Sequence, residues 1–190
     1  MFKKFAALAA AAALSLGVIT GCGVSGTTAD STGYSAENPL VLTLAHGLSE
    51  THTVHIAMTQ FADEVAEKTD GRIQVKIFPN GQLGSENENL EQLQAGVIAM
   101  TKVSAPGLAT YNDAFNTFGL PYIFNDTDDF YHVMDSQEMQ DFFLSTGDDG
   151  FVTLTYYTSG ARSFYTKDRA IRTPADLKGL KIRVQDMKSQ

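Results

Sequence analysis

The chain has 190 residues, of which 43% are hydrophobic and 19% charged, a composition typical of a globular protein rather than a disordered or membrane-embedded one. Its formal net charge is -8, which argues against nucleic-acid binding because phosphates need a basic face. The single cysteine, Cys22, excludes an internal disulfide bond.

The first 21 residues are typical of a secretory signal peptide. Lys3 and Lys4 precede an apolar run, 5–19, that is too short to span a bilayer comfortably. The sequence V-I-T-G-C that follows ends at Cys22 and resembles the bacterial lipobox, in which an aliphatic and two small residues precede an acylated cysteine. We therefore predict a lipoprotein signal peptide over residues 1–21 and a lipid anchor on Cys22. An ordinary signal peptide with a free cysteine is the alternative.

Residues 22–38 are predicted to form a flexible tether, because this segment is rich in Gly, Ser, Thr and Ala. Residues 21–26 match the letters G-x-G-x-x-G of dinucleotide-binding sites. They follow no predicted strand, open no helix and overlap the predicted cleavage site, so we exclude a dinucleotide site.

Strands and helices are predicted to alternate after the tether. A continuous apolar run predicts a buried strand at 40–45. Apolar side chains at helical spacing predict a helix that Ser49 would cap and Gly71 would end. Alternating apolar residues predict a second strand at 72–78.

The next elements complete a repeating pattern. A capping box at 85–88 predicts a helix that Gly96 would end, and 97–103 is a third strand candidate. The order β-α-β-α-β with short connections predicts a parallel sheet with right-handed crossovers.

The chain after the sheet is predicted to be less regular. Residues 104–107 are expected to form a loop, and the aromatic segment 115–124 is too interrupted by Gly119 and Pro121 for a helix. Residues 126–145 are expected to form one or two helices.

Further short elements are predicted toward the C-terminus. The strands expected there cover 151–157, 163–166 and 181–184. Between them, Thr-Pro-Ala-Asp at 173–176 predicts a capped helical turn. We interpret the chain as α/β, with a first lobe at 39–157 that is nearly complete and has a mainly parallel sheet. A second lobe would begin at 158–190, because this segment has too few elements to bury its own core.

Ligands of an open parallel sheet bind beyond the carboxyl ends of the strands. Of the residues at those ends, His46 and Ser104 are binding candidates; a histidine satisfied by backbone and a plain turn residue are the alternatives. Arg162 and Arg183 are further candidates, because a guanidinium pairs with a carboxylate through two parallel hydrogen bonds. Ordinary surface arginines are the alternative for this pair.

No catalytic or metal site is indicated. His52 and His55 are three residues apart on the first predicted helix, a spacing feasible for two zinc ligands. No acid or cysteine stands at motif spacing beside them, so we interpret both as surface histidines. The motifs G-x-S-x-G, H-E-x-x-H and the P-loop are missing from the sequence. We expect no enzyme activity, no cofactor and no metal.

Five sequence blocks occur in the order typical of one family. They are L-A-H-G-L-S-E-T-H-T-V-H at Leu44, F-P-N-G-Q-L-G-S-E-N-E at Phe78, L-E-Q-L-Q-A-G-V-I-A-M-T at Leu90, F-G-L-P-Y-I-F at Phe118 and R-T-P-A-D-L-K-G-L-K-I-R-V at Arg172. The resemblance runs from about Leu40 to Val184, and the family that the chain resembles is the DctP-like family, the substrate-binding receptors of TRAP transporters.

The resemblance implies a two-lobed, periplasmic-binding-protein-like architecture that closes on a small organic acid and delivers it to the TRAP permease in the membrane. By motif, Arg183 in L-K-I-R-V would pair with the ligand carboxylate and Arg162 in S-G-A-R would add a second contact. His46 and Ser104 match first-lobe positions near the ligand. The implied location is extracytoplasmic, in a periplasm or at the outer face of the plasma membrane. A ligand-sensing lipoprotein, or a hydrolase with catalytic residues in a missing C-terminal part, are the alternatives.

Overall fold

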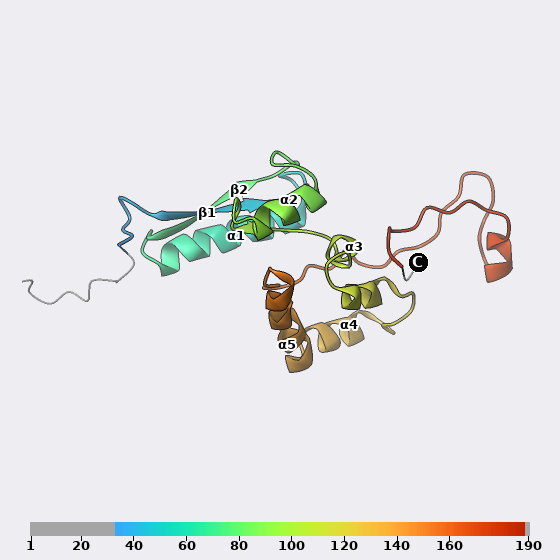
Figure 1. The fold of residues 1–190 in the computed structure, drawn as a ribbon. Helices are drawn as coiled ribbons and strands as arrows, with labels where there is room; N and C mark the ends of the chain where they lie inside the picture. The colour runs from blue at the N-terminus through green and yellow to red at the C-terminus, as the bar shows by residue number, and fades with distance from the viewer. Residues whose placement is uncertain (1–32, 189–190) are drawn as a thin grey trace, which may run out of the picture. The chain divides into compact units, whose positions relative to one another are not determined.

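The structure, a computed structural model, describes residues 33–188 (Figure 1). The chain divides into a unit at Met1–Gly33 and a unit at Tyr34–Gln190. The predicted signal peptide, Cys22 and most of the predicted tether lie outside the described residues. Within the described range, no helix is both long and apolar enough to cross a membrane.

A three-stranded parallel sheet forms around the first predicted strand. Strand β1 (Leu40–Ala45) lies between β2 (Ile73–Phe78) and β3 (Met100–Thr101), in the order β2-β1-β3. β1 pairs with β2 along its whole length, and its last two residues pair with β3. The predicted β-α-β-α-β order and the parallel pairing are confirmed. All three strands therefore end at one edge, which we call the carboxyl edge.

The third strand is shorter than the predicted 97–103. The amide of Val97 donates to the carbonyl of Gln92 at 2.8 Å and so belongs to the end of the preceding helix. Pairing with β1 begins only at Ala99, whose amide donates to the carbonyl of Thr43.

Helix α1 (Thr53–Lys68) connects β1 to β2 and packs against β2. Met58 of this helix is buried, and so are Leu44 and Ala45 of β1. The prediction that Ser49 caps this helix is wrong. His52 is the cap, because its Nδ1 accepts the amide hydrogen of Val54 at 3.1 Å.

Helix α2 (Glu86–Gln94) begins with the predicted capping box. The amide of Ser85 donates to the Glu88 carboxylate at 2.7 Å, and the Glu88 amide donates to the Ser85 hydroxyl at 3.4 Å. Gly84, just before the box, has φ +123°, and a Cβ there would approach a Glu88 oxygen to 2.9 Å. Glycine is therefore required for the chain to enter α2 as it does.

The chain continues into short helical elements. They are α3 (Ala105–Leu108), the 3-10 helix η1 (Asp113–Gly119), α4 (Thr127–Met134), α5 (Gln137–Ser145) and the 3-10 helix η2 (Thr146–Asp149). The loop prediction at 104–107 is wrong, because Pro106 lies in the first turn of α3, where its missing amide hydrogen costs nothing. The prediction of no helix at 115–124 is wrong for 115–119, which lie in η1, and no helix covers 120–124.

The predicted helical region 126–145 is confirmed as two helices. They separate at Ser136, whose hydroxyl accepts the amide hydrogen of Met139 at 3.2 Å and so caps α5. Aromatic rings from η1 and α5 pack together, with the Phe115 and Phe142 centroids 5.1 Å apart. Phe115 and Phe143 are buried in this aromatic core.

The C-terminal segment departs most from expectation. Figure 1 shows an extended trace after η2, and the 3-10 helix η3 (Pro174–Leu177) is its regular element. The strand predictions at 151–157, 163–166 and 181–184 are wrong for the described structure. Strand structure requires ladder hydrogen bonds to a neighbour, and these residues form none with the described residues. The capped turn at 173–176 is confirmed, since the Thr173 amide donates to Asp176 Oδ2 at 2.8 Å.

Leu90 provides a test of the core around α2, because its side chain is 1% exposed. We expect Leu90→Ala to lower the free energy of unfolding by about 2–5 kcal/mol, since the truncation leaves a cavity. Urea denaturation followed by circular dichroism would measure the change. Leu144→Ala on α5 is the matched control, because Leu144 is 62% exposed, and its effect should stay within about 0.5 kcal/mol. Equal losses for the two variants would contradict this core.

Candidate functional site at the carboxyl edge

His46, the first residue after β1, is held by its backbone on both sides. Its amide donates to the carbonyl of Phe78 at 3.0 Å, and its carbonyl accepts from the amide of Gly81 at 3.0 Å. The side chain is 0% exposed. The structure thus places His46 at the carboxyl edge, as predicted, but beneath the surface.

Both ring nitrogens of His46 have hydrogen-bonding partners. The amide of Leu48 donates to Nδ1 at 3.1 Å, and Nε2 lies 3.0 Å from Nδ1 of His55 on α1. Because a backbone amide can only donate, Nδ1 of His46 must be the acceptor and Nε2 must carry the hydrogen. The Nε2–H group of His46 then donates to Nδ1 of His55.

The environment of His46 favours the neutral ring. Burial lowers its pKa below the ordinary value of 6.5, and electrostatic interactions with His55, Lys102 and His52 lower it further. A neutral imidazole agrees with the hydrogen-bond directions above, because a doubly protonated ring has no acceptor for the Leu48 amide.

Ser104, the second candidate from the first lobe, is bound to a carboxylate. Its hydroxyl and its amide both donate to Oε2 of Glu86, the amide at 3.0 Å. The other oxygen, Oε1, accepts from Nζ of Lys102 at 3.1 Å. Glu86 opens α2 and Lys102 follows β3, so this trio links a helix N-terminus to the carboxyl edge.

Two opposing effects set the protonation of Glu86. Burial alone would raise its pKa, but the hydrogen bonds from Ser104 and the charge of Lys102 outweigh it. The pKa therefore lies below the ordinary 4.5. Glu86 is an ionised, half-buried carboxylate that can accept further hydrogen bonds.

Arg162 and Arg183 lie in the C-terminal segment, and both side chains are exposed. Within residues 33–188, no described hydrogen bond or ion pair joins either guanidinium to His46 or Ser104. The structure thus pairs His46 with His55 and Ser104 with Glu86, and it leaves the two arginines apart from these pairs. Their predicted contact with a ligand stays a prediction.

Three contributors to this edge were not predicted from the sequence. His55 was interpreted as a surface histidine, but it bonds His46, nine positions earlier. The sequence indicates Glu86 only as part of a capping motif, and it gives no signal that Lys102 belongs to a site. Each acts on a partner 9 to 18 positions away, and no local pattern signals such pairings.

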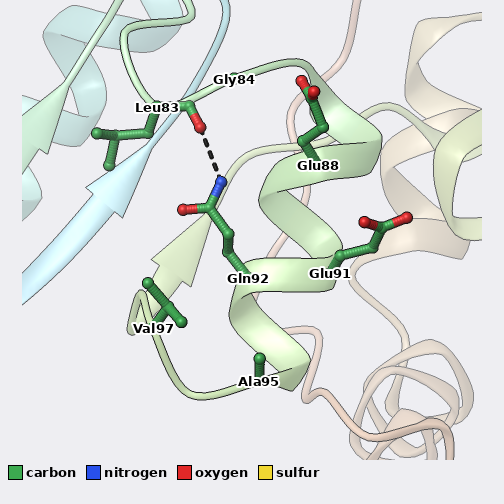
Figure 2. A pocket seen from close by; sticks show the side chains of 7 residues that line it. All are labelled: Leu83, Gly84, Glu88, Glu91, Gln92, Ala95 and Val97. Carbon is green, nitrogen blue, oxygen red and sulfur yellow. Dashed lines mark hydrogen bonds between the residues drawn. The ribbon is translucent and has the colours of Figure 1, made fainter.

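A hollow of about 420 Å³ lies elsewhere, beside α2 (Figure 2). Its lining consists of Leu83, Gly84, Glu88, Glu91, Gln92, Ala95 and Val97, and the amide of Gln92 donates to the carbonyl of Leu83 at 2.8 Å. None of the predicted binding residues lines it, and its two glutamates would repel an organic anion. Within residues 33–188, no three His, Cys, Asp or Glu side chains are placed to hold a metal ion.

A parallel sheet with polar groups at its carboxyl edge defines an α/β ligand-binding class, and comparisons with known proteins identify the family. The sequence model of bacterial extracellular solute-binding protein family 7, DctP, matches residues 44–190. The chain belongs to this family.

Individual relatives agree. The uncharacterized protein YiiZ of Salmonella typhimurium is 39% identical over 152 residues, covering 80% of this chain and 46% of YiiZ. The 2,3-diketo-L-gulonate-binding periplasmic protein YiaO of Escherichia coli is 30% identical, covering 76% of this chain and 44% of YiaO. A TRAP periplasmic solute-binding protein from Anaerococcus prevotii, with bound α/β-D-glucuronate, has a TM-score of 0.72 and 35% identity, covering 78% of this chain and 49% of that structure.

The chain spans about half the length of these relatives. The predicted family and fold class, a two-lobed α/β architecture with a parallel sheet in the first lobe, are confirmed. The family and its named relatives are extracytoplasmic solute-binding proteins rather than enzymes, in agreement with the predicted lack of enzyme activity. They give no support to the alternative of a hydrolase.

Glu86→Gln tests the carboxylate trio through its pH dependence. Because the pKa of Glu86 is lowered on folding, its contribution to stability is present above pH 4.5 and is lost as the pH falls through the folded-state value. We expect Glu86→Gln to lower the free energy of unfolding by about 1–2 kcal/mol at neutral pH, with a smaller difference from the native chain in acid. Urea denaturation at both pH values would measure it.

Glu91→Gln is the control for this experiment, since it makes the same chemical change at an exposed position of the same helix. A difference between Glu86→Gln and the native chain that stays constant from neutral to acid pH would contradict the charged trio.

Proposed function

We propose that this protein is an extracytoplasmic receptor that captures a hydroxylated organic acid and delivers it to a TRAP-type permease in the membrane. The observation that carries the proposal is the family match over 44–190, which includes both the Glu86 helix and the L-K-I-R-V motif of Arg183. The permease is proposed as partner on the strength of the family alone.

The carboxyl edge gives a physical reason for the ligand class. The Glu86 carboxylate accepts hydrogen bonds, so it suits the hydroxyl groups of a sugar acid, whereas a second ligand carboxylate beside it would be repelled. Lys102 offsets part of this repulsion but already serves Oε1 of Glu86. A hydroxylated monocarboxylate is therefore preferred over a dicarboxylate. The named ligands of the Escherichia coli and Anaerococcus prevotii relatives are acids of this kind, whereas other relatives are named for C4-dicarboxylates.

The arginines would supply the anion-binding half of the site. In this proposal, residues 39–157 form the first lobe and residues 158–190 begin a second lobe that carries Arg162 and Arg183. Arg183 pairs with the ligand carboxylate through two hydrogen bonds, and Arg162 adds a second ionic contact. Their side chains are exposed, and neither has an ion pair with another residue of 33–188 that would have to break before an anion binds. Ser104 and Glu86 contact the ligand from the first lobe, and His46 supports the same edge from below.

The N-terminal residues would fix the location. We propose that residues 1–21 are cleaved as a lipoprotein signal peptide, that Cys22 is acylated, and that residues 22–38 tether the receptor to the outer face of a membrane. Two acyl chains hold a protein at a membrane far more firmly than one. The receptor would then remain close to its permease.

Arg183→Ala tests the anion contact. We expect D-glucuronate to bind the native protein more tightly than succinate does, and Arg183→Ala to weaken D-glucuronate binding by ~3 kcal/mol, or about 100-fold. Isothermal titration calorimetry would measure both affinities. Arg172→Ala, which removes another exposed arginine of the same segment, should leave the affinity unchanged. Equal binding by Arg183→Ala and the native protein would remove Arg183 from the site.

Cys22→Ser tests the anchor. We expect the native protein to enter the detergent phase of a Triton X-114 partition and to incorporate labelled palmitate when expressed in a bacterial host, because both depend on acylation of Cys22. The variant should take up no label and should partition into the aqueous phase. Label on the variant, or none on the native protein, would refute the lipid anchor.

A further inference from the structure

Two loops that leave the carboxyl edge meet at His46. The first loop, 46–52, joins β1 to α1, and the second, 79–84, joins β2 to α2. The amide of Asn80 donates to the carbonyl of Leu48 at 2.9 Å, and the amide of Gly81 donates to the carbonyl of His46 at 3.0 Å. The first loop is in turn shaped by the bond from the Leu48 amide to Nδ1 of His46. The ring of His46 therefore sets the position of Leu48, and Leu48 sets that of the second loop.

The ring of His46 is oriented by a chain of hydrogen bonds that ends on α1. Its Nε2–H donates to Nδ1 of His55, so the hydrogen of a neutral His55 is on Nε2. That nitrogen lies 3.5 Å from the hydroxyl oxygen of Thr59, and the hydroxyl itself donates to the carbonyl of His55 at 3.0 Å. The hydrogen bonds of this chain all run in one direction. The bond from the Leu48 amide requires a free Nδ1 on His46, and the bond between the two rings requires a free Nδ1 on His55.

We propose that His55 is a positioning residue for the ligand-binding edge, which acts through the ring of His46 to hold loops 46–52 and 79–84 together, and that protonation of this histidine pair releases them. The role in ligand capture rests on the proposed function, whereas the coupling between the loops does not.

The effect of a proton follows from the geometry. A proton on Nδ1 of His46 would remove the acceptor of the Leu48 amide. A proton on Nδ1 of His55 would set two N–H groups against each other across 3.0 Å. Either event breaks one bond of the chain, so the loops lose a constraint in acid.

The groups around His46 set how far the pH must fall before its ring is protonated. The groups that act on His46 are His55 on α1, His52 at the cap of α1, and Lys102 after β3, and all three are basic. On β2, the backbone carbonyl of Phe78 accepts the amide hydrogen of His46. The Lys102 ammonium is paired with Glu86. Burial is the largest cause that lowers the pKa of His46. The ring of His46 therefore stays neutral below pH 6.5, and its neutral form is lost only as the pH falls through its lowered pKa.

Amide hydrogen exchange measured by NMR tests the loop coupling without any ligand. At about pH 8, where histidine is neutral, His55→Ala should speed exchange at Leu48 and Gly81 by about tenfold or more. The Lys102 amide, which donates to Ala45 on the other side of β1, is the internal reference and should change less than twofold. His55→Asn should restore slow exchange, because its Oδ1 occupies the place of Nδ1 as an acceptor.

His52→Asn is the matched control, since Asn keeps the cap of α1 while removing a neighbouring histidine. Its exchange rates at Leu48 and Gly81 should equal those of the native chain. Unchanged exchange in His55→Ala, or failure of His55→Asn to restore it in a folded protein, would overturn the proposal.

The native protein provides the pH test. Ring ¹⁵N shifts should show the Nε2–H form of His46 at about pH 8, and Leu48 protection should fall with the same midpoint as protonation of His46. Protection that persists after both rings are protonated would overturn the proposal even if a variant failed to fold.

A final titration with D-glucuronate separates the two proposals. Binding that weakens in His55→Ala by about fivefold or more and recovers in His55→Asn supports both. No D-glucuronate or succinate binding by the native protein, with the exchange results as expected, rejects the proposed function and keeps the loop coupling. Normal binding by His55→Ala rejects the positioning role.

Discussion

The pairing of β1 on both of its sides is the constraint on which the rest of this structure depends. Six register pairs tie β1 to β2, and two more tie its end to β3. Because all pairs are parallel, three connections that are distant in sequence leave the sheet at the same edge. The strand order alone therefore places three segments at this edge: His46, the turn after Phe78, and residues 102–104. The polar chemistry of the edge is a consequence of the strand order.

Two polar clusters at this edge are built differently. The Glu86 trio keeps its charges, because the carboxylate gains hydrogen bonds from Ser104 and an ion pair with Lys102 that exceed the cost of burial. The ring of His46 is neutral, because burial and basic neighbours lower its pKa. One cluster thus holds a carboxylate paired with Lys102, and the other contributes rigidity. A binding edge needs both, since affinity depends on charge and on how little the site must rearrange.

The sequence predicted those parts of the fold in which local pattern and tertiary packing agree. β1, β2 and α2 were predicted within a residue or so, because a buried apolar run, an alternating strand and a capping box are each decided by neighbours in sequence. Predictions failed where the decisive partner is distant. Ser49 has the side chain of a helix cap, but His52 is the cap in the structure. The alternating residues from Phe151 predict a strand, but they form no strand ladder with the described residues.

The candidate site shows the same division. His46 and Ser104 could be named from their position after strands, but their partners His55 and Glu86 could not. Each of those carries another, more common local explanation: an exposed helix face for His55 and a helix start for Glu86.

The extended segment after α5 has a consequence for handling the protein. Leu154 is 71% exposed, Tyr165 is 96% exposed and Val184 is 53% exposed, and the backbone around them lacks ladder partners among the described residues. Such stretches are templates on which separate molecules add strands to one another. Concentrated samples are therefore expected to aggregate through this segment, and crystallisation or storage would benefit from low protein concentration.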